Sequence, residues 1–341
     1  MIDMYHCITQ LWFGFEHQIN ITEDECNALQ EARTRALLLS SFEDKFMLVL
    51  ENFEELEQEI IHLPLHQMIY SDYATPLFID NLRLLNRRFA NLMTTCRLYK
   101  DQTAHDVSTI FGKESQQFAD YERLHSQYYD QELGYRTMEA VRNFLQHRSL
   151  VLSGTSHEAK RIQEEGLVAH TGKVNLKPQS LREEGGFKQK ILSELDSIAD
   201  KDGNVDIRPL VRGYISALGK IHLELRKMFE GDAAKYDALI LDAIQRINQL
   251  SGEEHDSAYI ATYNDRGNVS SHFVLLKDFV ERRRRIVNRT QHITHYATNY
   301  VSSRYNVPQN SDKKSCSSKV HHSLCVNSTL RHSKPNSCAR C

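Results

Sequence analysis

The apolar residues of the first 150 positions recur every three or four residues, the spacing of helices with one buried side. Thr22, with Glu25 three residues later, forms a capping-box signature at the start of the first such segment. Ser41 with Asp44 is a second start signal. The helix that it opens should end before Pro64, because proline lacks the N–H that a helix interior needs. We therefore predict two consecutive helices before this proline.

A longer helix is predicted from Pro76, because its apolar positions alternate steps of four and three as in helices packed in a bundle. These positions are Phe78, Leu82, Leu85, Phe89, Leu92, Cys96 and Tyr99. Gly112 should end this helix, and two shorter helices are predicted at 114–129 and 132–149. Residues 1–150 are thus expected to form an antiparallel helical bundle.

Residues 151–305 are expected to form an α-rich region with short strands. Segments rich in β-branched residues predict one small hairpin within 150–176 and another around Asn264–Gly267. Helical patterns cover 187–199, 207–229, 232–250 and a basic stretch at 277–303. Residues 306–341 are rich in Ser, Cys and His, basic and almost free of large apolar side chains, so we expect a disordered tail. The predicted fold class is therefore mainly α.

The composition is typical of a water-soluble protein, with 26% charged residues. No stretch approaches the roughly 18 apolar residues of a membrane span, so we expect no membrane insertion. The N-terminus carries acidic Asp3 and no basic segment, which argues against a signal peptide and favours the cytoplasm. The formal net charge is −3, yet residues 1–150 sum to about −10 and residues 276–341 to about +10. The basic C-terminal part could meet nucleic acid or pair with the acidic half.

The seven cysteines fall into two groups. Cys7, Cys26 and Cys96 are scattered, which predicts reduced and buried side chains. The others crowd the tail beside several histidines and are weak candidates for zinc ligands: Cys316, Cys325, Cys338 and Cys341. Zinc is disfavoured, because the first two are separated by eight residues and no apolar residues flank the group to support its ligands. We expect neither a metal nor another cofactor.

The densest positive patch lies on the predicted basic helix. It consists of Arg282, Arg283, Arg284, Arg285 and Arg289. This patch is a candidate for phosphate contacts, but consecutive arginines spread around a helix, so a solvated or intramolecularly paired face is the competing interpretation. His62 and His66 have the i, i+4 spacing of a metal-binding pair, yet the proline between them should break the helix that would align their rings. Gly-rich phosphate loops, GxSxG and HExxH are absent, which argues against the common nucleotide-binding, hydrolase and zincin classes.

The stretch YRTMEAVRNFLQHRSLVL, residues 135–152, contains the strongest candidate site. At about 100° per residue, Met138, Val141 and Leu145 share one helix face. The opposite edge carries Arg136, Glu139, Asn143 and His147, and Arg142 lies at the boundary. An imidazole can transfer a proton near neutral pH, and a guanidinium can stabilise charge on a phosphate. This combination suits chemistry on a phosphodiester.

Arg142 and Asn143, followed after three residues by His147 on a late helix of an all-α bundle, resemble the Arg-x4–6-His signature of the HEPN superfamily. The resemblance covers about residues 70–150. Many members are metal-independent endoribonucleases of toxin–antitoxin or phage-defence systems, and they usually act as dimers. The resemblance implies that His147 assists attack by a ribose 2′-hydroxyl, Arg142 stabilises the phosphate and Asn143 orients its neighbours. It also implies RNA, a second copy and a cognate protein as partners.

The spacing alone does not select this site. With 25 Arg and 17 His, the chain contains four Arg–His pairs of this spacing, about the number expected by chance. The Arg-Asn pair, the helix register and the long helix upstream distinguish Arg142 and His147 from the other three. Two further interpretations stay open: a non-catalytic helical interaction or regulatory protein of antitoxin or scaffold type, and an RNA-binding module that uses Arg282–Arg285 without chemistry.

Overall fold

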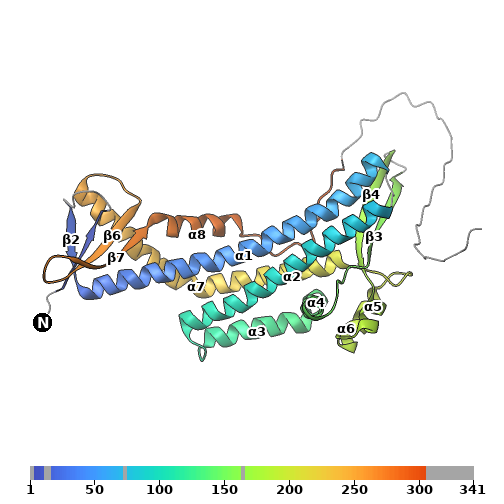
Figure 1. Cartoon of the computed structure of the whole chain (residues 1–341), viewed down its shortest axis with the longest axis horizontal. Helices are drawn as coiled ribbons and strands as arrows, with labels where there is room; N and C mark the ends of the chain where they lie inside the picture. Colours follow the sequence, from blue (N-terminus) through green and yellow to red (C-terminus); the bar gives the residue numbers. More distant parts are fainter. Residues whose placement is uncertain (1–3, 11–16, 72–74, 163–165, 305–341) are drawn as a thin grey trace, which may run out of the picture. The chain divides into compact units, whose positions relative to one another are not determined.

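Most of the chain is helical in the computed structural model, which describes residues 4–10, 17–71, 75–162 and 166–304. Within these residues, eight helices accompany two small antiparallel sheets (Figure 1), so the predicted mainly-α fold is confirmed. None of the described helices has the length and apolar content that crossing a bilayer requires. Residues 1–302 form one compact unit. The predicted disordered tail, 306–341, lies outside the described residues.

Helix α1 is a single helix of 48 residues, Glu23–Tyr70. It begins after Thr22 as predicted, and the Thr22 hydroxyl accepts a hydrogen bond of 3.2 Å from the backbone N–H of Glu25. The prediction of two helices is wrong. The second start signal lies inside α1, where Phe42 and Phe46 continue the buried face without a break. Packing of a continuous buried face contributes more to stability than a local capping signal does, so the chain forms one helix and not two.

Pro64 also lies inside α1, where we predicted an end. A proline in a helix interior costs about 3 kcal/mol, so packing must offset the loss. Strand β4, Leu167–Leu176, supplies that packing. A Cβ added to Gly172 of β4 would lie 3.1 Å from Pro64 Cδ and 3.8 Å from Leu63 Cβ, which shows how closely strand and helix approach.

The three helices predicted between residues 76 and 149 are present. They are α2 (Thr75–Phe111), α3 (Gln116–Gln131) and α4 (Leu133–His147). Gly112, with φ of 91°, ends α2, and the Ser115 hydroxyl caps α3 by accepting from the Phe118 N–H at 3.1 Å. Together with α1 and with α7, which spans Ile207–Ser251, these helices enclose one large core.

Helix α7 is one helix of 45 residues, Ile207–Ser251, where the sequence predicts two. Gly231 does not end this helix. Phe229 before the glycine and Ala233 and Tyr236 after it are all buried, so the buried face of the helix continues through Gly231. The helix contacts α1 and α4. These contacts join the two parts that the sequence analysis separates at residue 150.

Two antiparallel sheets accompany the helices (Figure 1). The first has the order β2-β1-β6-β7, with β1 at Tyr5–Thr9, β2 at Gln18–Ile21, β6 at Ser257–Tyr263 and β7 at Val269–Leu276. The second has the order β3-β4-β5, with β3 at Gly154–Ile162, β4 at Leu167–Leu176 and β5 at Val205–Asp206. Both predicted hairpins are confirmed, as β6–β7 and β3–β4. The first two strands were not predicted. Helices α5 (Pro178–Glu184) and α6 (Gln189–Ile198) lie between β4 and β5, and α6 matches the helix predicted at 187–199.

Helix α8, Lys277–Arg289, begins where predicted but does not reach residue 303. The Thr290 hydroxyl donates to the Ile286 carbonyl at 2.7 Å and accepts from Arg226 Nη2 at 2.6 Å, which holds the end of the helix on α7. Residues 290–302, here called the strap, then follow α7. The Ala297 N–H donates to the Ser216 hydroxyl at 3.2 Å. Contacts with α7 therefore replace the last turns of the predicted helix.

Candidate functional site

The buried side of α4 fixes which of its residues face outward. Tyr135, Met138, Val141 and Phe144 are buried at steps of three, as an amphipathic helix requires. Gly134 lets α4 approach α7 closely, since a Cβ there would lie only 2.5 Å from a backbone carbonyl oxygen of α7. This packing determines which side of α4 faces the core.

Two members of the predicted polar edge of α4 are engaged inside the protein. Arg136 donates to the carboxylate of Glu194 on α6 at 2.7 and 3.0 Å. Glu139 forms an ion pair with Lys100 at 2.9 Å and accepts from the Tyr214 hydroxyl at 2.8 Å. Both side chains tie α4 to its neighbours. Only the C-terminal part of the predicted edge is left for another role.

That C-terminal part carries the three candidate site residues. The Arg142 side chain donates from Nη1 to the Asn143 side-chain oxygen at 2.8 Å. Asn143 and His147 are exposed, and in a helix their Cβ atoms are neighbours at i, i+4. Among the described residues, the His147 side chain has no hydrogen bond or ion pair. The structure thus turns the Arg142 guanidinium toward Asn143 and leaves the imidazole of His147 accessible.

The chain that follows His147 is anchored on both sides. The rings of Phe144 and Phe187 lie 5.4 Å apart, and Arg148 donates to the Glu184 carbonyl oxygen. The buried Asn86 side chain of α2 accepts from the backbone N–H of Leu152 and donates to its carbonyl, both at 3.2 Å. The candidate residues therefore stand at a firmly positioned helix end.

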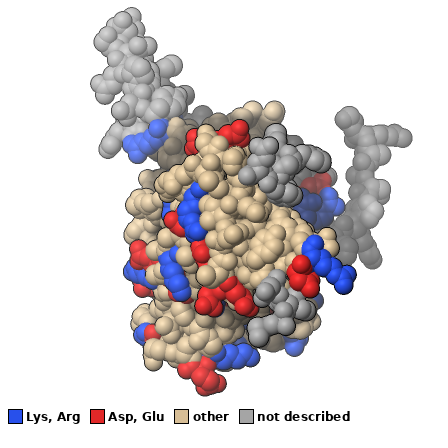
Figure 2. Space-filling view, turned by 90° about the vertical axis from the view of Figure 1, so that its left-hand side faces the viewer, with Lys and Arg blue, Asp and Glu red and all other residues tan. Residues whose placement is uncertain are grey.

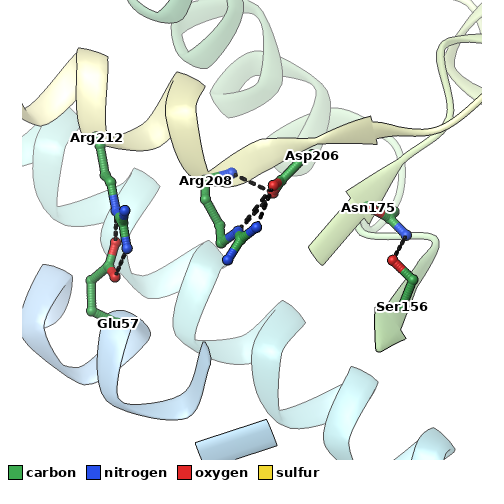
Figure 3. Close-up of polar contacts among 6 residues, drawn as sticks. All are labelled: Glu57, Ser156, Asn175, Asp206, Arg208 and Arg212. Carbon is green, nitrogen blue, oxygen red and sulfur yellow. Dashed lines mark hydrogen bonds and ion pairs between the residues drawn. The ribbon is translucent and has the colours of Figure 1, made fainter. Parts of the chain in front are cut away.

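Two hollows in the described part of the chain lie elsewhere. One, of about 560 Å³, lies at the end of α7 and includes Asn248 and Lys277. The other, of about 420 Å³, lies between α1 and the strap. Arg212 lines this second hollow and pairs with Glu57 at 2.7 and 2.5 Å (Figure 3). Neither hollow includes a candidate residue of α4.

Figure 3 also shows two polar contacts that position the start of α7 and the nearby hairpin. Asp206 caps α7 by accepting from the Arg208 N–H at 3.1 Å and pairs with the Arg208 guanidinium at 2.7 Å. Asn175 of β4 donates to the Ser156 hydroxyl of β3 at 3.3 Å. These contacts stabilise the second sheet and its junction with α7.

The four consecutive arginines of α8 all pair with carboxylates. The pairs are Arg282–Asp44 (2.9 Å), Arg283–Asp237 (2.6 Å), Arg284–Asp237 (3.1 Å) and Arg285–Asp278 (2.8 Å). Side chains 282, 284 and 285 nevertheless stay 55–65% exposed, so pairing does not hide them. Arg289 is exposed as well. At the end of the unit that carries the four-stranded sheet, charges of both signs are interspersed and form no single-sign patch (Figure 2).

A buried histidine that the sequence analysis missed lies between α1 and α7. The ring of His222 is fully buried and stacks between Phe42 and Phe46, with centroid distances of 4.4 and 4.2 Å. Burial lowers the pKa of His222 to about 4, so the imidazole is neutral at pH 7. Its two nitrogens contact the Tyr99 hydroxyl at 3.0 Å and Glu43 Oε2 at 3.1 Å.

Glu43 completes this buried cluster. Arg226 donates to its two oxygens at 2.9 and 2.6 Å. Burial raises the pKa of the Glu43 carboxyl, but hydrogen bonds from His222 and Arg226 outweigh that effect and bring it below its usual value. A carboxylate only accepts, so His222 must donate to Glu43 and accept from Tyr99. The polar groups of this cluster are hydrogen-bonded to one another, and none of its residues lines either hollow. Both observations indicate a structural role.

Comparisons of the chain with protein-family models, with curated proteins and with solved structures find no match. The selection of the candidate residues therefore depends on the geometry and chemistry of this chain alone.

The predicted metal candidates have mixed outcomes. Cys316, Cys325, Cys338 and Cys341 lie outside the described residues. Cys7, Cys26 and Cys96 are buried free thiols, as predicted. No group of three or more His, Cys, Asp or Glu in the described residues is arranged to hold one metal ion. The argument against His62 and His66 is wrong, however, because α1 is unbroken between them and their ring centroids are 5.8 Å apart.

Proposed function

We propose that this chain is a HEPN-like protein that binds RNA and cleaves it with Arg142, Asn143 and His147. One observation carries the proposal: His147 is exposed and lacks a polar partner among the described residues, on a helix whose Arg136 and Glu139 are engaged. A histidine kept for packing would be buried and hydrogen-bonded, as His222 is. The structural interpretation of the polar edge is therefore disfavoured.

Each residue has a distinct role in this proposal. His147 accepts the proton of a ribose 2′-hydroxyl, and the freed oxygen attacks the adjacent phosphorus. The 5′-oxygen of the next nucleotide leaves with a proton, so the products carry a 2′,3′-cyclic phosphate and a 5′-hydroxyl. Arg142 stabilises the charge that develops on the phosphate oxygens, and its bond to Asn143 orients the guanidinium. A second imidazole that protonates the leaving oxygen would come from a second copy, as the resemblance implies. The reaction consumes neither metal nor cofactor.

A non-catalytic interaction or regulatory role is the second candidate. Seven large apolar side chains at the end of α1 and the beginning of α2 stay 39–67% exposed. They are Ile61, Leu65, Met68, Ile69, Tyr70, Phe78 and Ile79. Ile61, Leu65, Met68 and Ile69 have helical spacing and share one side of α1, and exposed apolar surface of this kind marks protein-interaction sites in soluble proteins. This surface favours a protein partner, whether an antitoxin-like protein or a scaffold.

The deciding experiment incubates the full chain with total RNA in EDTA. Wild type should release fragments with cyclic phosphate ends, and His147→Ala should slow this release about 100-fold or more. The matched control is His105→Ala, which removes an exposed histidine of α2. Arg142→Ala should act like His147→Ala, whereas Arg87→Ala, at an exposed arginine of α2, should not.

Two outcomes would count against catalysis by this edge. Equal cleavage by wild type and His147→Ala would place the activity elsewhere. RNA binding without cleavage, with a salt dependence that flattens when Arg282–Arg285 are replaced by Gln, would identify an RNA-binding module instead.

A further inference from the structure

Two pairs of histidines lie on the elements that meet where α1 packs against the β3–β4 hairpin: one pair on α1 and one on the hairpin. His62 and His66 stand two residues before and after the proline of α1 that packs against Gly172. His157 of β3 is directly opposite Gly172 in the sheet register. His170 precedes Gly172 by two residues on β4, so both project from the same side of the strand. The strand register thus places His157 and His170 beside each other on the face of the hairpin that packs against α1.

His157 and His170 form the closest pair. Nε2 of His157 and Nδ1 of His170 lie 3.1 Å apart, with the ring centroids at 5.1 Å. Two nitrogens that bind one tetrahedral zinc ion at 2.0–2.1 Å lie about 3.3–3.4 Å apart. The pair would have to open by only about 0.2–0.3 Å to reach that geometry. We propose that His157 and His170 together bind a divalent transition-metal ion of the Zn²⁺, Ni²⁺ or Cu²⁺ class.

The chemistry of the pair suits such an ion. A metal ion binds the neutral form of an imidazole, through the lone pair of one ring nitrogen. In the metal-free pair, one ring donates its N–H to the other. Metal binding therefore requires that the donor ring shift this proton to its other nitrogen, so that both facing nitrogens offer a lone pair. Imidazole ligands select zinc, copper and nickel over magnesium and calcium.

The site has two protein ligands, because no three His, Cys, Asp or Glu side chains of the described residues surround one point. Water would fill the other positions, which makes the bound ion exchangeable. The turn of α1 after Pro64 carries two buried polar atoms near this contact. Among the described residues, His66 Nδ1 and Gln67 Oε1 have no hydrogen-bond partner. Buried polar atoms of this kind call for a polar neighbour.

Thermal unfolding of the full chain tests the proposal. After EDTA treatment and removal of the chelator, addition of Zn²⁺ or Ni²⁺ should raise the unfolding midpoint progressively, since the ion binds the paired strands and not the unfolded chain. His157→Gln and His170→Gln should each abolish the rise. Every variant keeps the four cysteines of residues 306–341, so metal bound there contributes equally to all.

Two controls separate the hairpin pair from other histidines. His105→Gln should keep the full rise, and so should the double variant His62→Gln/His66→Gln. Absence of a rise in wild type, a rise that persists in both hairpin variants, or its loss in the His62/His66 variant would each overturn the proposal. If a hairpin variant unfolds already in EDTA, electron paramagnetic resonance of Cu²⁺ in wild type decides: two coordinating nitrogens are expected, and none would refute the site.

Discussion

Gly219 sits where the strap crosses α7, and it permits a sensitive test of that contact. A Cβ at Gly219 would lie 2.1 Å from the carbonyl oxygen of Ile293 and 3.1 Å from its carbonyl carbon. Real Cβ atoms stay at least 3.0 Å from such atoms, so Gly219→Ala must push the strap outward by nearly 1 Å. The neighbour is backbone, which cannot rotate away as a flexible side chain does.

The expected change in stability is the difference between two effects. Replacing Gly by Ala in a helix interior stabilises by about 1 kcal/mol. Overpacking of this kind costs about 1–3 kcal/mol, and partial exposure of the buried Ile293 side chain adds up to about 2 kcal/mol. Gly219→Ala should therefore lower the free energy of unfolding by up to about 4 kcal/mol, with a central value of about 2 kcal/mol.

The same helix contains two matched controls. Gly213 and Gly231 have no atom within 4 Å of an added Cβ. Gly213→Ala and Gly231→Ala should each raise the free energy of unfolding by up to about 1 kcal/mol. Gly231→Ala further tests whether α7 is continuous where the sequence predicts a break.

Urea denaturation of the three variants, followed by circular dichroism, measures these free energies. Hydrogen exchange gives an independent measurement, because Gly219→Ala should speed exchange of the Ala297 N–H that donates to Ser216. If Gly219→Ala stabilised the protein as much as Gly213→Ala, the strap would not pack on α7 as described.

Three further predictions concern stability in acid, the two hydrogen bonds between Asn86 and the Leu152 backbone, and the candidate site. Burial lowers the pKa of His222 to about 4 and that of His125 to about 3, from 6.5, so the unfolded chain binds more protons than the folded chain below pH 6.5. The free energy of unfolding should therefore be at its full value above pH 6.5 and should fall by at least about 3 kcal/mol in total towards pH 4. Urea denaturation midpoints measured against pH test this expectation. A flat profile would show that these rings are not buried. Asn86→Ala should cost about 2–4 kcal/mol, because it removes both buried hydrogen bonds to the Leu152 backbone. A loss below about 0.5 kcal/mol would contradict these two bonds. His147→Ala should leave the thermal midpoint nearly unchanged, since the side chain is exposed and unpartnered in the described structure, and a loss of about 2 kcal/mol would reveal a structural role.

Local signals made much of the fold predictable. The capping pair Thr22 and Glu25 marked the start of α1, and the apolar repeat marked α2. The path of α1 through Pro64 was not predictable, because it depends on Gly172, which lies more than 100 residues later in the chain. Propensity and capping describe a segment by itself, whereas packing between distant segments decides whether a weak signal ends a helix.

The candidate site was likewise predictable only in part. Helix register alone predicted that Asn143 and His147 would share an outer edge, and both are exposed. It could not predict that Glu139 turns inward, since its partners come from α2 and α7. Glu43 and His222, separated by 179 residues, left no pattern in the sequence that could have paired them.

The position of β1 in its sheet has a consequence for synthesis of the protein. β1 pairs with β2 on one side and with β6 on the other, and Thr9 is aligned with Tyr259, some 250 residues later. At about 5–20 residues per second, a ribosome needs roughly 12–50 s to make the intervening chain. During that time one edge of β1 has no strand to pair with. An unpaired edge invites association with other chains. Newly made N-terminal segments of this protein are therefore expected to need protection, by a chaperone or by slow release, until β6 emerges.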